Sequence, residues 1–169
     1  MDMKVRTLDD LFVDMIKDLY SAETQLVKAL PKMAKKSTAP ELKKGFETHL
    51  QETMSQKERL EQIAEMLDIS PKGKKCLATK GLIEEAEESI EDVKDPEVLD
   101  AALIGSGQKV EHYEIASYGT AIAFAKMLEM DDKIISLLVK SLNEEKATDE
   151  KLTEVAEAFV NERAAEVTV

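Results

Sequence analysis

The chain has 169 residues, of which 43% are hydrophobic and 34% charged, a balance typical of a folded globular protein. Its formal net charge of −12 disfavours binding to nucleic acid or to an anionic lipid surface. The sequence lacks an apolar stretch of membrane-spanning length and a signal-peptide pattern, and it has one cysteine, so we expect a cytoplasmic protein.

The composition favours helices over strands, because Leu, Ala, Glu and Lys dominate and only 6 glycines and 4 prolines are present. Apolar residues recur every three or four positions over four long segments and one shorter segment. The first long segment begins near Thr7, a predicted N-cap, and we expect Pro31 to bend or end it. The second begins at Pro40, and the turn residues of 68–75 end it.

The second half of the chain begins with a short predicted helix over 81–93. Asp95 and Pro96 then supply an N-cap and a first-turn proline for the third long helix, and the last one begins near Asp131. Connections of about 5 residues within each helix pair, and one of about 27 between the pairs, are typical of a ferritin-like arrangement. The sequence therefore predicts an all-α protein, a single ferritin-like four-helix bundle domain over 1–169 with a short fifth helix in its long crossover.

Each long helix carries acidic or imidazole side chains on or beside its apolar stripe, near the middle of its length. In chain order these residues are Glu23, His49, Glu52, Glu111, Glu114, Glu145 and Asp149. A buried, unpaired carboxylate costs several kcal/mol unless it is protonated or bound to metal, and the nearby lysines fall on the outer helix faces. Two divalent cations would neutralise this set and use its oxygens as ligands. The pattern predicts a dinuclear metal site.

Several of these candidates also have a simpler interpretation. Glu23 would be a surface residue if its helix were rotated by one position, and a histidine such as His49 is often a core residue. The role of Glu52 depends on whether its helix faces inward at 45-49-52-56 or at 46-49-53-56. Glu114 can be a rim charge near His112, which itself is either exposed or a partner of a ligand.

Other polar residues fall beside the same stripes. Glu144 is expected to be an exposed partner of Lys140 or Lys146. The tyrosines at positions 20, 113 and 118 are expected in the core, where a hydroxyl near the carboxylates could tune or shield them. The glutamines at 56 and 108 are candidates to hydrogen-bond the metal ligands.

Five segments in the same order carry a resemblance to a known family: DLYSAETQL (18–26), HLQET (49–53), KGLIEEA (80–86), QKVEHYEIASYGT (108–120) and LNEEKATDEKLT (142–153). Over nearly its whole length the chain resembles the YciF/YciE family of bacterial stress proteins. The resemblance implies a ferritin-like bundle with a rubrerythrin-like dinuclear centre of iron, with manganese as the alternative. It also implies a cytosolic homodimer expressed under stress.

The ferritin-like pattern also implies how the residues of this chain are used. Glu23 matches the lone glutamate of the first helix, and Glu111 with Glu114 resembles the paired glutamates that rubrerythrins carry on their third helix. The pattern expects a histidine three residues after a glutamate on the other two helices, and this chain has Ser55 and Thr148 there. The resulting site is richer in oxygen ligands, with His49 and Asp149 as the expected substitutes.

The expected function is that of a stress-response protein whose non-haem iron site oxidises Fe(II) or reduces O₂ or peroxide. Because the chain lacks the Cys-rich iron module of rubrerythrins, such a cycle would need an external electron donor. The alternative is a non-catalytic dimeric scaffold or binding protein with a vestigial metal site.

Overall fold

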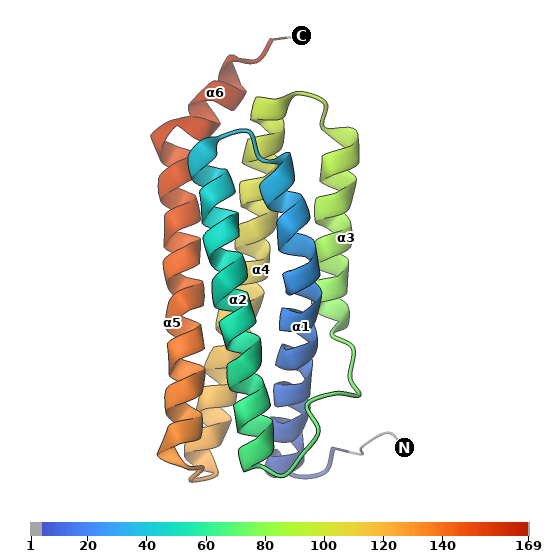
Figure 1. The fold of residues 1–169 in the computed structure, drawn as a ribbon, viewed down its shortest axis with the longest axis vertical. Coiled ribbons are helices and arrows are strands. Elements are labelled where there is room, and N and C mark those ends of the chain that lie inside the picture. The colour runs from blue at the N-terminus through green and yellow to red at the C-terminus, as the bar shows by residue number, and fades with distance from the viewer. Residues whose placement is uncertain (1–4, 169) are drawn as a thin grey trace.

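The computed structural model describes residues 5–168, and all regular secondary structure in that range is helical (Figure 1). In chain order the elements are α1 (Leu8–Lys36), α2 (Pro40–Met66), α3 (Leu77–Asp92), α4 (Pro96–Met127), α5 (Asp132–Val155), the π-helical stretch η1 (Ala156–Val160) and α6 (Asn161–Glu166). The prediction of an all-α protein is confirmed.

The helices begin at the predicted capping residues. Thr7 and Asp10 form a reciprocal capping box at the start of α1, and Asp95 accepts two backbone N–H groups at the start of α4. Pro31 lies on the exposed side of α1, and the helix continues past it to Lys36. The short helix α3 begins at Leu77, four residues before the predicted start at 81.

The four long helices lie side by side, with contacts between α1 and α2, α2 and α5, α5 and α4, and α4 and α1 (Figure 1). The connection from α2 to α4 runs back along the length of the helices and contains α3, which packs against α1 and α4. Helices α1 and α5 run in one direction and α2 and α4 in the other (Figure 1). Because the four long helices lie side by side along their lengths, residues at mid-length on all of them share one level of the structure.

Two separate apolar clusters lie on either side of that level. One contains Phe12, Leu60, Tyr118 and Leu138, and the other contains Leu26, Phe46, Leu103 and Leu152, among further residues of the same four helices. Apart from Asp100 and Ser106 in the first part of α4, the buried polar residues of the four long helices fall between their contributions to the two clusters. The core is therefore interrupted at mid-length by a polar layer, which is where the sequence places its acidic residues.

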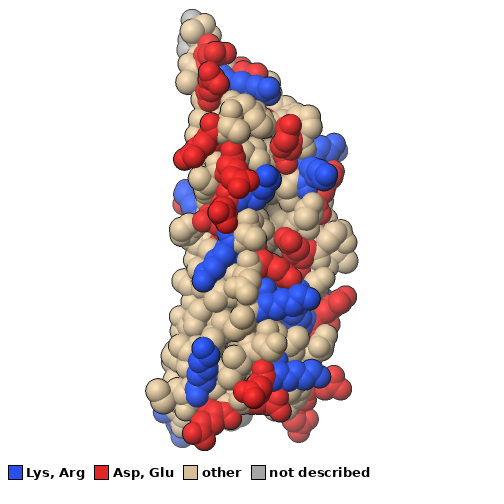
Figure 2. Space-filling model, turned by 90° about the vertical axis from the view of Figure 1, so that its left-hand side faces the viewer, with Lys and Arg blue, Asp and Glu red and all other residues tan. Residues whose placement is uncertain are grey.

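The surface carries both signs of charge. Figure 2 shows acidic and basic side chains interspersed over the face on which α5 lies. Within residues 5–168, none of the helices combines the length and the apolar character that crossing a membrane requires.

One buried aspartate ties the turn between α1 and α2 to α4. Asp100 of α4 is 3% exposed and accepts hydrogen bonds from the backbone N–H of Thr38 (2.8 Å), the Thr38 hydroxyl (2.6 Å) and the backbone N–H of Ala39 (2.8 Å). Ala39 is the N-cap of α2 and has no side chain that can cap it. Asp100 thus supplies from another helix the acceptor that the start of α2 lacks.

We expect Asp100→Ala to lower the free energy of unfolding by about 2–4 kcal/mol, because three donors lose a charged acceptor. Urea denaturation monitored by circular dichroism measures this change. Glu58→Ala, on the exposed face of α2, is the control and should stay within about 0.5 kcal/mol of the unaltered protein. A loss at Asp100 no larger than that of the control would show that the turn does not depend on this acceptor.

Candidate metal centre

Four side chains from three helices converge in the polar layer. Ligand atoms of His49 on α2, Glu111 and Glu114 on α4, and Glu145 on α5 all lie within 4.8 Å of one another. Glu23 on α1 is fully buried at the same layer, where its carboxyl accepts a hydrogen bond from the Tyr118 hydroxyl of α4. We call these five residues the carboxylate cluster, and each of the four long helices contributes to it.

The carboxylate cluster is closed to solvent, because its five residues are between 0% and 2% exposed. His49 Nε2 lies 3.2 Å from Glu111 Oε1 and 3.6 Å from Glu145 Oε2, and neither contact is aligned as a hydrogen bond. On the other side of the ring, His49 Nδ1 lies 3.3 Å from Glu52 Oε2 and 3.2 Å from the Thr148 hydroxyl. The imidazole thus turns one nitrogen toward the cluster and the other toward the gap between α2 and α5.

Most of the buried side-chain oxygen and nitrogen atoms that lack a hydrogen-bond partner in residues 5–168 belong to this cluster. They are Glu23 Oε2, His49 Nε2, Glu111 Oε2, and both carboxyl oxygens of Glu114 and of Glu145. Buried polar atoms are nearly always satisfied in folded proteins, so a concentration of orphaned acceptors requires an explanation. These atoms point to ligands that the polypeptide does not itself provide.

Burial changes the proton affinity of three carboxyl groups in the same direction. Desolvation raises the pKa of Glu23 from 4.5 to about 7, against the effects of the Tyr118 hydroxyl and the charge of His49. It raises the pKa of Glu114 well above its ordinary value, with further contributions from Glu23 and Glu145. The pKa of Glu145 is raised by desolvation and by Glu111. Without metal, these groups favour their protonated, neutral forms.

His49 and Glu111 form the charged pair of the cluster. Desolvation would lower the pKa of His49, but the charges of Glu111 and Glu145 raise it well above its ordinary value. Desolvation alone would raise the pKa of Glu111, and the charge of His49 outweighs it, so the pKa of Glu111 is lowered. His49 and Glu111 therefore favour their charged forms, and Glu23, Glu114 and Glu145 favour their neutral ones.

Two contacts border the cluster: one comes from Tyr118, whose hydroxyl the sequence placed near the carboxylates, and the other from Arg59, which the sequence analysis missed. The Tyr118 hydroxyl donates to Glu23 Oε1, and Tyr118 is fully buried. Arg59 forms a bidentate pair with Glu144 (2.6 and 2.7 Å) and also donates to the Ser141 hydroxyl (2.8 Å). The expectation that Glu144 pairs with Lys140 or Lys146 is wrong, because Arg59 lies on the inner side of α2 and reaches it across the helix interface. The signal available in the sequence was the position of Arg59 one turn after Gln56.

The two remaining candidates, Glu52 and Asp149, lie outside the group of converging atoms. Helix α2 faces inward at 46-49-53-56, so the Glu52 side chain lies at the edge and is 35% exposed. Asp149 accepts a hydrogen bond from Gln108 (3.3 Å) and lies 3.1 Å from His112 Nε2, whose side chain is 70% exposed. Both acidic residues thus already have protein partners at the rim of the layer.

The donor set of the cluster fits divalent first-row metals. Carboxylate oxygens with one imidazole nitrogen suit iron or manganese, and the orphaned atoms all belong to these groups. Contacts beside the cluster leave most of its ligand atoms unpaired, because the Tyr118 hydroxyl uses one oxygen of Glu23 and the Arg59–Glu144 pair uses none.

The raised pKa values predict that the metal-free protein loses stability as the pH rises. A folded-state pKa above the unfolded one means that the folded state binds protons more tightly, so stability falls as pH rises from 4.5 through about 7 for Glu23. The loss from Glu23 alone is on the order of 3 kcal/mol. Melting temperatures of metal-free protein between pH 5 and 8 measure it.

Glu23→Gln keeps an acceptor for Tyr118 and removes the titration, so its melting temperature should depend less on pH. Glu150→Gln, on the exposed face of α5, is the control and should follow the unaltered protein. The same pH dependence in Glu23→Gln as in the control would contradict the assignment to this buried carboxyl.

The match to known proteins covers nearly the whole chain. Residues 7–165 match the family model described as a domain of unknown function, DUF892. Protein YciF of Escherichia coli strain K12 is 48% identical over 163 residues, which make up 96% of this chain and 98% of that protein. The crystal structure of the E. coli stress protein YciF gives a TM-score of 0.88 at 48% identity, covering 93% of this chain and 99% of that one.

Two further structures extend this result. A protein of Rhodopseudomonas palustris, YcfI, which is provisionally described as structural, has a TM-score of 0.87 at 46% identity and covers 90% of this chain and 97% of its own. A Xanthomonas campestris protein shares the fold at 23% identity with a TM-score of 0.72, covering 92% of this chain and 94% of its own. The resemblance found in the sequence is confirmed. The chain belongs to the YciF family, whose members share the DUF892 domain.

Proposed function

We propose that this chain is a ferritin-like four-helix bundle whose polar layer holds a dinuclear metal centre, with iron as its metal and manganese as the alternative. The observation that carries the proposal is the set of orphaned buried atoms in Glu23, His49, Glu111, Glu114 and Glu145. Leaving such groups unpaired is costly, and a protein that used the layer only for packing would be more stable with apolar residues there.

The five cluster residues would hold the metal, and Glu52 and Asp149 would border it. Iron bound there would supply the electrons for reduction of O₂ or peroxide, or would itself be oxidised from Fe(II). The protein residues contribute proton storage, since Glu23, Glu114 and Glu145 favour their protonated forms without metal and would release protons on loading.

Three further features of the chain serve this role. Tyr118 holds the Glu23 carboxyl by its hydroxyl, which limits the rotation of that side chain. The two apolar clusters above and below the layer exclude water from it. His49 would have to lose the proton on Nε2 to bind metal through that atom. Its other ring nitrogen, Nδ1, has Glu52 and Thr148 as polar partners.

The cellular role that we propose is a response to stress, because a relative at 48% identity is named a stress protein. A homodimer and an external electron donor belong to the same proposal.

A second candidate is a non-catalytic structural protein. It is supported by the provisional description of the R. palustris relative and by Ser55 and Thr148 at the positions where ferritin-like sites carry histidine.

Metal-free protein incubated anaerobically with Fe(II) or Mn(II) should bind about two ions per chain and release protons as it does so. Titration calorimetry in buffers of different ionisation enthalpy measures both quantities. Glu111→Gln should lose most of the binding, and Glu150→Gln should retain it. Absence of binding in the unaltered protein, or equal binding in both variants, would contradict a metal centre in this layer.

The two candidate functions differ in turnover. If the centre is catalytic, iron-loaded protein supplied with a reductant should consume peroxide over many turnovers, Glu150→Gln should do so at the same rate, and Glu111→Gln should be inactive. An oxygen electrode and a peroxide assay measure the rates. Stoichiometric metal binding without turnover, together with a raised melting temperature, would favour the structural role.

A further inference from the structure

The carboxylate cluster is closed, so any ion that reaches it must pass a wall of side chains. Its residues are at most 2% exposed, and the apolar clusters cover it at both ends. Cations do not cross packed aliphatic side chains readily, because the loss of their hydration is costly there. An entry route should therefore run between two helices, at a point where polar groups reach from the solvent to the cluster.

Two of the helix interfaces are tied by polar contacts at the level of the layer. Between α4 and α5, the Gln108 amide donates to Thr153 (2.8 Å) and to Asp149 (3.3 Å). Lower on the interface of α2 and α5, Arg59 and Glu144 form their bidentate pair beside Gln56. At both places the two helices are held together by side chains that hydrogen-bond to each other across the interface.

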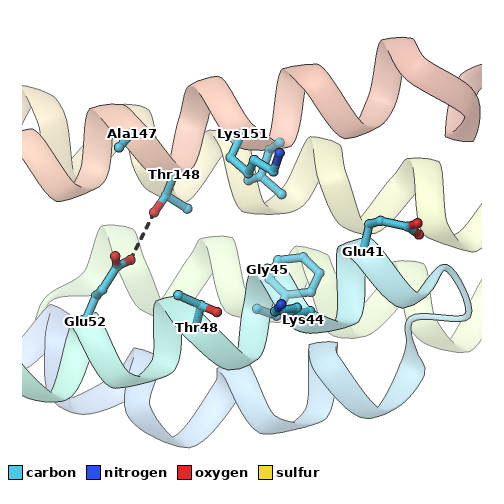
Figure 3. Close-up of a pocket in the computed structure, with 10 residues that line it drawn as sticks. Glu41, Lys44, Gly45, Thr48, Glu52, Ala147, Thr148 and Lys151 are labelled. Atoms are coloured by element: carbon cyan, nitrogen blue, oxygen red, sulfur yellow. Dashed lines mark hydrogen bonds between the residues drawn. The ribbon is translucent and has the colours of Figure 1, made fainter.

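The upper part of the α2–α5 interface is built differently. Glu52 and Thr148 face each other there, with the Thr148 hydroxyl 3.3 Å from Glu52 Oε2 (Figure 3). Both also contact His49 Nδ1, at 3.3 and 3.2 Å. The Glu52 side chain is 35% exposed while that of His49 is 2% exposed, so one carboxylate joins the solvent to a residue of the cluster.

Glu52 and Thr148 also line one end of a groove between α2 and α5, opposite the end at Glu41 (Figure 3). The groove has a volume of about 400 Å³ and is lined further by Glu41, Lys44, Gly45, Thr48 and Lys151, among other residues (Figure 3). Gly45 and Thr48 lie two and one helical turns before Glu52, and a side-chain carbon at Gly45 would meet no atom within 4 Å. The groove is therefore open beside Gly45, at the part that lies about two turns from Glu52.

The charges along the groove are mixed, with Lys44 and Lys151 beside Glu41 and Glu52. Lys151 is paired with Glu154 at 2.9 Å, which reduces its effect on a cation in the groove. The carboxylate nearest the cluster is that of Glu52, and it lacks a lysine or arginine partner among the ion pairs of residues 5–168.

We propose that the groove between α2 and α5 is the route by which divalent cations enter the cluster, with Glu52 as the transfer ligand and Thr148 as the side chain that must turn aside. The proposal rests on the proposed metal centre and gives Glu52 a different role from the resident ligands. A carboxylate at the boundary offers oxygen ligands as the ion loses its water, and release of the Thr148 hydrogen bond opens the contact to His49.

Filling the groove tests the route without changing a polar group. Gly45→Phe places a ring in the open space, and its backbone is helical, so the substitution also favours α2. Stopped-flow mixing of metal-free protein with Co(II), followed by visible absorption, measures uptake. We expect Gly45→Phe to slow uptake and chelator-driven release alike by about tenfold or more, with unchanged stoichiometry and affinity. Gly105→Phe, at an exposed position of α4 where a side-chain carbon also meets open space, should leave the rates unchanged.

Glu52→Gln keeps the size of the side chain and removes its charge, and it should also slow uptake with unchanged stoichiometry. Glu150→Gln, an exposed carboxylate of α5 that does not line the groove, is the matched control and should load at the rate of the unaltered protein. Unchanged rates in Gly45→Phe, or equal slowing in Glu150→Gln, would overturn the route. A lower stoichiometry in Glu52→Gln with unchanged rates would make Glu52 a resident ligand and overturn its transfer role. Failure of the unaltered protein to bind Co(II) would instead contradict the metal centre itself.

Discussion

The main physical constraint on this structure is the free-energy cost of burying several carboxyl groups in the middle of an apolar core. Glu23 and Glu114 have no basic partner among the ion pairs of residues 5–168, and His49, which lies between Glu111 and Glu145, neutralises only one charge. Protons or metal ions are the available means of neutralising the rest. The layer is held in place because the apolar clusters on either side fix the helices in a register where all four mid-points meet.

Polar contacts around the layer maintain that register. Asp100 joins α4 to the turn between α1 and α2, and Arg59 joins α2 to α5 through Glu144. Tyr118 joins α4 to α1 through Glu23. The Asp100 and Arg59 contacts use no acceptor of the carboxylate cluster, and the Tyr118 contact uses one oxygen of Glu23. The atoms of the cluster that stay unpaired are the support for the proposed metal-binding role.

Family membership accounts for the fold, whereas the ligand atoms of the carboxylate cluster determine which metals would suit it. Belonging to the YciF family is shown by the length and identity of the match. The oxygen-rich composition of the cluster, with His49 as its one imidazole, differs from the ferritin-like pattern that has two histidines. A harder ligand set favours iron or manganese over softer metals, and the shared protons of its carboxyl groups couple any loading to pH.

The sequence by itself determined the helices, their caps and the candidate residues. Periodicity fixes which side of a helix is apolar, so Glu23, His49, Glu111 and Glu145 were recognisable as polar interruptions, and Thr7 and Asp95 marked helix starts. Only the tertiary structure decided which candidates converge. The rotation of α2 places Glu52 at the rim. Across the helix interfaces, Asp149 pairs with His112 and Glu144 pairs with Arg59. Such choices depend on distances between helices, and the pattern within one helix contains no information about its neighbours.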